Sequence, residues 1–226
     1  MASSGHTAAH DWPGHATWLA TILSRYLRGG GHFPEALTVF SHALVAARRT
    51  GDRAAEATAL HDIGLVDLEV GRFQQAADHF RQALTLSREA GDQAGEALAL
   101  ANMGLAETLL GRFEHAARHQ HEALAFFRDT GDRFGEAHAL GYLGWIPGLQ
   151  GRCQEAAGYH QQSLGLFREI GDREGEATAL GLLGDIDLRL GRNQHAAGYL
   201  RQALARFQDI GSRGAEAGVL ARLGDS

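Results

Sequence analysis

One interval of forty residues organises almost the whole chain of 226 residues. Seven sets of small or apolar residues recur at that interval without an exception. Three of these sets are Gly51, Gly91, Gly131, Gly171 and Gly211; Leu60, Leu100, Leu140, Leu180 and Leu220; and Gly64, Gly104, Gly144, Gly184 and Gly224. A fixed period of about 20 to 50 residues is typical of arrays in which each unit buries a face against the next. The sequence therefore predicts a stack of equivalent units.

Each unit is expected to contain two helices, as the segment 51–90 illustrates. Gly51 can take the left-handed conformation that ends one helix, and Asp52 can cap the next. Small and apolar residues at spacings of three and four predict helices over about 53–70 and 73–90. The connections have only two residues, so paired helices should run antiparallel. A glycine inside a helix costs about 1 kcal/mol relative to alanine. The recurrence of Gly64 therefore predicts a close crossing of two helices.

The recurring positions also carry a family resemblance. Its residues in one unit are Leu60, Ile63, Gly64, Ala76, Phe80 and Ala83. Their order and spacing resemble the tetratricopeptide repeat, although that family's unit has about 34 residues. The variant with Gly-Asp-Arg between units resembles the repeats of spindle-orientation adaptors and the C-terminal arm of actinobacterial STAND-type regulatory ATPases. The resemblance implies an all-α, right-handed α-solenoid of antiparallel helix pairs. It divides the chain into a disordered lead-in (1–14) and a solenoid (15–226), with repeats at about 15–50, 51–90, 91–130, 131–170 and 171–210 and a terminal helix at 212–225.

The chain departs from the family at one position of the first helix. The aromatic residue expected three positions after the helix glycine is replaced by Asp67, Glu107, Pro147 and Asp187. Proline removes a backbone donor, so Pro147 is predicted to kink its helix. Our hypothesis is that this kink widens a groove and presents Tyr142 and Trp145. Neutral drift in a tolerant array is the alternative.

Composition excludes several classes of function. The formal net charge is −6, whereas nucleic-acid binding needs a basic face. The chain has no lysine and so cannot form a Walker phosphate loop. No pairing of a nucleophile with a base is evident, so we expect no enzyme activity and no cofactor. No apolar run is long enough for a membrane span, and cytoplasm is the default location. The lone Cys153 is interpreted as a residue that fills a helix entrance.

The 13 histidines and a recurring glutamate could suggest ligand sites. His115 and His119 are four residues apart on one helix, a spacing that can place both against a metal ion. No further ligands complete a set, so packing or solvated histidines are favoured and no metal is assigned. Glu56 and its equivalents recur in the first turn of each first helix, where a negative charge suits the helix dipole.

The resemblance implies that the first helices line a concave groove. Positions assigned to this groove differ from unit to unit, whereas the packing positions do not, which is the pattern of a fixed scaffold with one face tuned to a ligand. The groove residues transferred from the family are His61, Asp62, Leu65, Glu69, Asn102, Leu105, His138, Tyr142, Trp145, Asp185 and Arg189. Leucine and tryptophan at these positions could instead belong to the core between repeats.

The preferred function is a protein–protein interaction scaffold that binds a peptide or helical segment in the groove. The alternative is a sensor arm of a larger STAND-type ATPase or transcriptional regulator. An enzyme or a metal protein is the least favoured class. The expected partner is a protein or peptide, with neither nucleic acid nor membrane, and self-association through the terminal repeats stays open.

Overall fold

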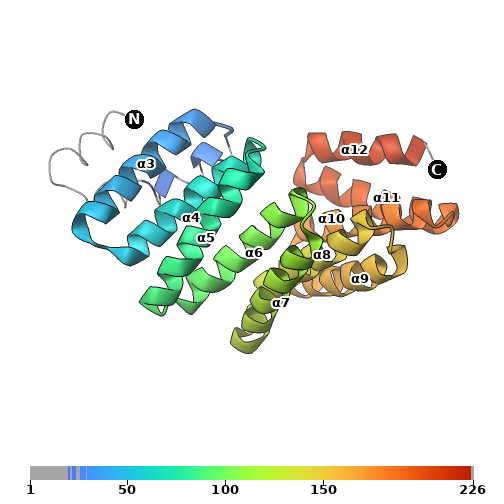
Figure 1. Cartoon of the computed structure of the whole chain (residues 1–226). Coiled ribbons are helices and arrows are strands. Elements are labelled where there is room, and N and C mark those ends of the chain that lie inside the picture. The colour runs from blue at the N-terminus through green and yellow to red at the C-terminus, as the bar shows by residue number, and fades with distance from the viewer. Residues whose placement is uncertain (1–19, 21, 24–25, 29, 225–226) are drawn as a thin grey trace. The chain divides into compact units, whose positions relative to one another are not determined.

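The computed structural model describes residues 20, 22–23, 26–28 and 30–224. Over these residues it contains helices and no strand. The chain forms two compact units, Met1–Ala123 (unit 1) and Leu124–Ser226 (unit 2). The helices are α3 (Phe33–Thr50), α4 (Arg53–Glu69), α5 (Phe73–Ala90), α6 (Gln93–Leu109), α7 (Phe113–Thr130), α8 (Arg133–Leu149), α9 (Cys153–Ile170), α10 (Arg173–Arg189), α11 (Asn193–Ile210) and α12 (Arg213–Gly224). Figure 1 shows their order along the chain.

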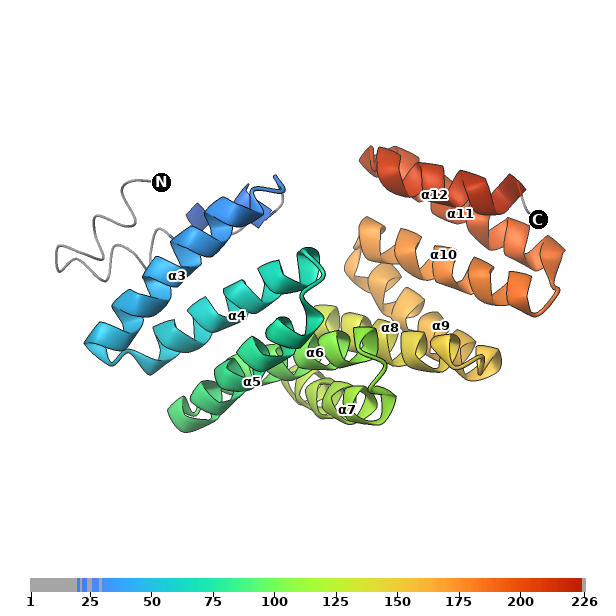
Figure 2. The same cartoon turned by 45° about the horizontal axis from the view of Figure 1, so that its top comes forward.

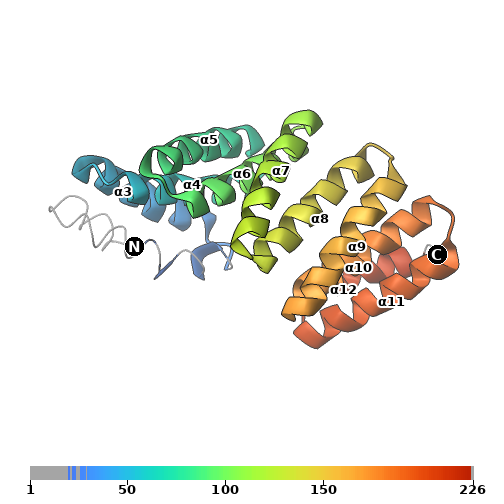
Figure 3. The ribbon, with the colours of Figure 1, turned by 90° about the horizontal axis from the view of Figure 1, so that it is seen from below.

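The described helices confirm the predicted pairs. The expected helices at 53–70 and 73–90 correspond to α4 and α5, with Val70 as the residue that follows α4. The lead-in expected at 1–14 and the beginning of the first repeat, through residue 19, lie outside the described residues. Within unit 1, α4 packs on α5 and α5 on α6; within unit 2, α8 packs on α9, α9 on α10 and α10 on α11. Figures 2 and 3 show these neighbours lying side by side in two further views. The all-α solenoid of antiparallel helix pairs is confirmed.

The helix ends follow the sequence signals. Gly51 and Gly91 have φ of 69° and 68°, and each ends a second helix in the left-handed conformation. Asp52 then accepts a hydrogen bond from the backbone N–H of Ala55 at 3.0 Å. A cap of this kind contributes about 1 kcal/mol to helix stability. The same aspartate cap recurs at the start of α6, α8 and α10, so the turn between units is set locally.

The helix glycines are points of close approach, as predicted. A Cβ added at Gly64 would lie 2.7 Å from the ring of Phe80, which stands on the following helix. At Gly184, the added atom would lie 2.8 Å from Leu200. Phe80 and Leu200 are both fully buried. A small residue in the first helix therefore lets the second helix place a large side chain directly over the backbone.

A column of ion pairs joins four of the second helices, α3, α5, α7 and α9, to the next first helix. Arg48, in the last turn of α3, contacts Glu56 of α4 at 2.8 Å. The equivalent pair in unit 2 is Arg168 and Glu176, at 2.9 Å. Helix-dipole stabilisation was the only role expected for these glutamates. The missed signal was the arginine that stands eight residues before each of four glutamates, at 48, 88, 128 and 168.

Candidate functional site

Every predicted groove residue is at least partly accessible to solvent. Glu69 and Arg189 are exposed, and the other nine are half-buried. By contrast, the invariant packing residues Leu60 and Leu180 are each 1% exposed. The variable positions of the first helices thus form a face on each unit: the unit 1 face on α4 and α6, and the unit 2 face on α8 and α10. The eleven predicted residues are thus accessible, and their role in binding stays a prediction.

On the unit 1 face, His61 and Asn102 meet across neighbouring first helices. Asn102 Nδ2 lies 2.8 Å from His61 Nε2 and 3.1 Å from the Leu98 carbonyl oxygen. The amide nitrogen can only donate, so His61 Nε2 accepts and Nδ1 carries the ring's hydrogen. Burial, and secondarily the charge of Arg28, lowers the pKa of His61 to about 4. His61 is therefore an uncharged ring at neutral pH, and it also packs on Phe80 with ring centroids 5.6 Å apart.

On the unit 2 face, an aromatic group surrounds His138. Its ring centroid is 6.4 Å from that of Tyr142, 4.5 Å from Phe134 and 5.1 Å from Phe167. Burial lowers the pKa of His138 and raises that of Tyr142, so both side chains are favoured in their neutral forms. Trp145 lies one turn beyond Tyr142 on the same helix and is half-buried.

Two charged side chains complete the unit 2 face. Asp185 contacts Arg222 of α12 at 3.2 Å, and Arg189 donates to the Gly148 carbonyl oxygen at 2.8 Å. Burial raises the pKa of Asp185, whereas Arg222 and Arg189 lower it by less. Each of these contacts joins one first helix to the next, as the His61–Asn102 contact does in unit 1. The predicted site residues therefore also tie neighbouring repeats together.

Pro147 does not shorten its helix. α8 extends through Pro147 to Leu149 and has 17 residues, as do α4, α6 and α10. The buried Pro147 keeps its carbonyl oxygen bonded to the Arg152 N–H at 2.8 Å, and Asp67 in α4 bonds Arg72 in the same way at 2.7 Å. A wider groove at Pro147 stays a prediction.

Three of the histidines predicted as packing or solvated residues, His79, His115 and His119, have identifiable partners. His119 Nδ1 lies 2.7 Å from the buried carboxylate of Glu107, and His79 Nδ1 lies 2.8 Å from that of Asp67. His115 contacts Arg118 instead of joining His119. Over the described residues, no group of three or more histidine, cysteine or acidic side chains is placed to hold a metal ion. None of the described helices is long and apolar enough to cross a bilayer.

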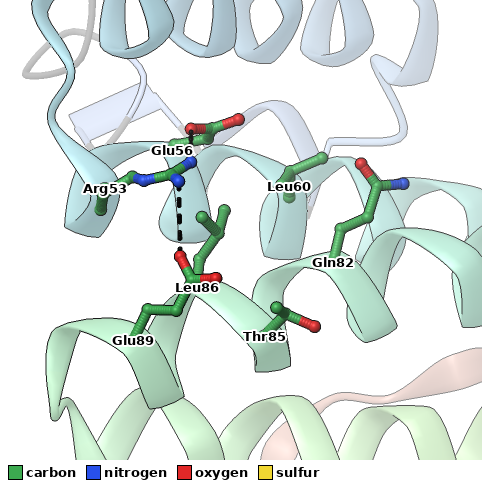
Figure 4. Close-up of a pocket in the computed structure, with 7 residues that line it drawn as sticks. All are labelled: Arg53, Glu56, Leu60, Gln82, Thr85, Leu86 and Glu89. Carbon is green, nitrogen blue, oxygen red and sulfur yellow. Dashed lines mark hydrogen bonds and ion pairs between the residues drawn. The ribbon is translucent and has the colours of Figure 1, made fainter.

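One pocket lies between α4 and α5, away from the predicted groove residues. It has a volume of about 240 Å³, and Figure 4 shows the Arg53 guanidinium at one end, between Glu56 and Glu89. Arg53 contacts both carboxylates at 3.4 Å. In unit 2, Arg133 contacts Glu136 and Glu169 at 2.9 Å and 3.5 Å. Because its charges already pair and the network recurs, this pocket is a feature of repeat packing.

A second kind of pocket opens beside the predicted groove residues. In unit 1 it has a volume of about 260 Å³ and is lined in part by His61 and Leu98. In unit 2 a pocket of about 220 Å³ is lined in part by Gly181 and Gly218, which stand three periods later at the equivalent positions. The first-helix faces are therefore the hollowed ones on which variable residues gather.

These features define a class of protein, the helix-pair solenoids built from repeats. The tetratricopeptide repeat family model matches residues 10–89, 95–169 and 148–209, and the chain belongs to that family. A search of curated proteins finds no match.

Three solved structures illustrate the fold similarity. BtubC (BKLC) from P. vanneervenii is 20% identical with a TM-score of 0.75, over 93% of this chain and 90% of that one. The Rap conjugation gene regulator of plasmid pLS20, in complex with the Phr* peptide, is 14% identical with a TM-score of 0.78, over 95% of this chain and 59% of that one. A STAND protein with a tetratricopeptide repeat sensor from Pyrococcus horikoshii is 17% identical with a TM-score of 0.77, over 97% of this chain and 33% of that one. Identities this low establish similarity of fold alone.

Proposed function

We propose that this chain is a protein–protein interaction scaffold that binds a peptide or a helical segment of a partner protein on its first-helix faces. It acts by binding and catalyses no reaction itself. The observation that carries the proposal is the contrast between buried packing positions that stay constant and accessible positions that vary from unit to unit. In a repeat array whose packing positions are fixed, the accessible positions are free to be tuned to a ligand.

The chemistry of the faces suits a polypeptide ligand. Tyr142 and Trp145 are half-buried aromatic residues, the types that most often dominate binding energy at interfaces. Asn102 keeps its amide oxygen as an acceptor while its nitrogen donates to His61 and Leu98. Such groups can bind a peptide backbone while the aromatic residues contact its side chains. The pLS20 regulator of similar fold was solved with a peptide, which supports the same kind of ligand here.

The proposal is tested with peptides selected on the purified chain from a displayed library of random 12-residue sequences. Selected peptides should bind the wild-type chain and lose at least about tenfold in affinity for Tyr142→Ala/Trp145→Ala, because removing a hot-spot residue costs about 2 kcal/mol or more. Tyr159→Ala is the matched control, since it removes a half-buried aromatic residue from the second helix α9. Circular dichroism checks that each variant keeps its helicity. Equal binding by wild type and the double variant would remove Tyr142 and Trp145 from the site, and a library that yields no peptide would overturn the function.

A second candidate is a sensor arm within a longer regulatory ATPase. It is favoured by the similarity to the sensor-bearing STAND protein, of which this chain spans about a third. If the native gene product is purified as one polypeptide much larger than 24.3 kDa, that result would support this candidate. A cytoplasmic location and self-association through terminal repeats remain predictions under either candidate.

A further inference from the structure

The pocket on the unit 1 face lies where α4, α5 and α6 meet. Its volume is about 260 Å³, and its lining includes Thr58 and His61 of α4, Ser87 of α5, and Gly95 and Leu98 of α6. Pockets that enclose a whole small molecule begin at about 300 Å³. The unit 1 pocket is therefore sized for a single side chain.

At the crossing of α8, α9 and α10, unit 2 fills the equivalent space with a ring of its own. Phe167 stands two periods after Ser87, and Gly175 stands two periods after Gly95. A Cβ added at Gly175 would lie 2.3 Å from the Phe167 ring, which is buried and also packs on His138. The earlier pair in this unit, Phe127 and Gly135, shows the same close approach at 2.4 Å. In unit 2 the glycine thus makes room for the phenylalanine.

The equivalent pair in unit 1 has a glycine, Gly95, but has Ser87 in place of the phenylalanine. Ser87 is 2% exposed, and a Cβ added at Gly95 would lie 2.3 Å from Asp92 Oδ2 and 2.7 Å from Ser87 Oγ. A serine side chain is far smaller than a phenylalanine, so the space between α4 and α6 stays open as the pocket. The other groove-side pocket, in unit 2, has Phe207 in its lining and opens over Gly181 and Gly218, where unit 1 has His61 and Leu98.

The charges around the pocket select its occupant. Eight of the nine lining residues are uncharged, including the neutral His61 held by Asn102. The ninth, Asp92, uses one carboxylate oxygen to accept the Gly95 N–H at 3.0 Å. An acidic side chain would be repelled by Asp92, and a neutral ring would meet His61, Leu98 and alanine methyl groups. The charge of Asp92 disfavours an acidic occupant, and the mostly apolar lining and the size favour a neutral aromatic side chain.

We propose that the unit 1 pocket binds one aromatic side chain of a peptide ligand, so that the ligand supplies the ring that unit 2 supplies for itself. This inference rests on the proposed peptide-binding function and names the ligand chemistry at one point of its surface. Ser87, Gly95 and His61 are then residues that determine specificity.

The smallest probe is N-acetylphenylalaninamide, which carries one ring and two peptide groups. Titrated into the ¹⁵N-labelled full chain, it should produce saturable shifts at the amides of Ser87, Gly95 and Leu98, with a dissociation constant on the order of 1 mM for a ligand of this size. The corresponding leucine, arginine and glutamate amides should bind more weakly, glutamate least. Equal binding of the arginine or glutamate probe, or shifts that appear elsewhere, would overturn the proposal.

Ser87→Phe fills the pocket with the residue that the chain already uses at 127, 167 and 207. The variant should fold, melt at the same or a higher temperature, and lose the probe-induced shifts. Thr85→Phe is the control, because it adds the same ring at an exposed position of α5 and should leave probe binding unchanged. Failure of Ser87→Phe to fold would contradict its equivalence to Phe167, and retained binding would contradict the pocket assignment. Leu98→Ala removes one wall and should weaken binding severalfold with the fold intact.

Peptides selected on the wild-type chain separate this inference from the proposed function. They should be enriched in phenylalanine, tyrosine or tryptophan and should bind Ser87→Phe at least about tenfold more weakly. If selected peptides bind both proteins equally, the scaffold function stands and the pocket assignment falls. If no peptide is selected, the proposed function itself falls.

Discussion

In unit 1, Asp67 and Glu107 lie in the core and each pairs with a histidine of the following helix. In unit 2, the equivalent position carries Pro147 and then Asp187, and tyrosine replaces the histidine in both repeats, at 159 and 199. The helices α4, α6, α8 and α10 nevertheless have the same length, aspartate cap and glycine crossing. Without a histidine, the buried Asp187 contacts Arg192 at 3.6 Å. A buried carboxylate requires a partner, so the two positions form one packing element with several solutions.

A similar exchange occurs at the helix crossing. The residue that lies over the glycine is Phe80 or Gln120 in unit 1 and His160 or Leu200 in unit 2. All four are fully or almost fully buried, and two of them are polar. Gln120 donates to the Ala101 carbonyl oxygen at 2.7 Å. The repeat therefore specifies a large side chain at this position more strictly than it specifies an apolar one.

The largest expected effect comes from breaking the Glu107–His119 pair. His119→Leu would leave the carboxylate of Glu107, whose side chain is 5% exposed, without its partner at 2.7 Å. Breaking one side of a buried pair costs about 3 kcal/mol or more, and the urea midpoint should fall accordingly. His79→Leu is the control, because Asp67 would keep Arg72 at 2.9 Å and the loss should be about 1 kcal/mol. Equal losses in the two variants would show that the contact of His119 with Glu107 stabilises the fold no more than packing does.

The double variant Glu107→Leu/His119→Leu sharpens this test. It removes both members of the pair, as unit 2 does with Pro147 and Tyr159. Most of the stability lost in His119→Leu should return, since no buried charge is left unpaired. A double variant that is no more stable than His119→Leu would mean that the pair matters through its shape.

A smaller effect is expected at the helix glycines. Gly64→Ala places a methyl group 2.7 Å from the Phe80 ring, and overpacking of a core costs about 1 to 3 kcal/mol. Gly158→Ala is the matched change at a helical glycine with no other group within 4 Å, and it should gain about 0.5 to 1 kcal/mol through helix propensity. Thermal unfolding should thus shift in opposite directions. A stabilised Gly64→Ala would contradict the close crossing.

The fold was predictable because its determinants are local and repeated. Gly51, Asp52 and Gly64 each act through the turn or crossing nearest to them, and the sequence shows the same residues again every forty positions. The accessible positions on the first helices were predictable from the family resemblance, whereas variation alone does not identify them, since the buried column of Phe80 and Gln120 varies as well.

The side-chain partners were not predictable from the repeat alone. Asp67 of α4 contacts His79 of the neighbouring helix α5, and Asn102 contacts His61, which stands 41 residues earlier in the chain. The repeat pattern shows which residue types recur, but it does not show which of the recurring positions lie close together. It therefore predicts the histidines only as solvated or packing residues. The unit 1 pocket was not predicted because it depends on Ser87, in a column that reads alanine at 47 and phenylalanine at the next three repeats.

The smallest expected effect depends on pH and compares His160 with Gln120. Burial lowers the pKa of His160 to about 4 from its ordinary 6.5, so the folded chain holds the ring neutral. The unfolded chain takes up a proton below about pH 6.5, so this group costs stability progressively as the pH falls from 6.5 towards 4. His160→Leu places the residue of the equivalent Leu200 over Gly144 and removes that cost. Relative to wild type, the variant should gain about 1 to 2 kcal/mol between pH 7 and pH 5, measured by urea unfolding at each pH.

Gln120→Leu makes the equivalent exchange in unit 1 without removing a titratable group. Its effect on stability should therefore be the same at pH 7 and pH 5, whatever its sign. Within the described residues, His160 Nδ1 and Gln120 Oε1 are both buried without a hydrogen-bond partner, so the two leucine variants relieve a similar defect. The difference in pH dependence between His160→Leu and Gln120→Leu therefore measures what protonation of His160 costs in stability. Parallel pH profiles would mean that His160 takes up its proton in the folded chain and that unit 2 tolerates a charge over Gly144.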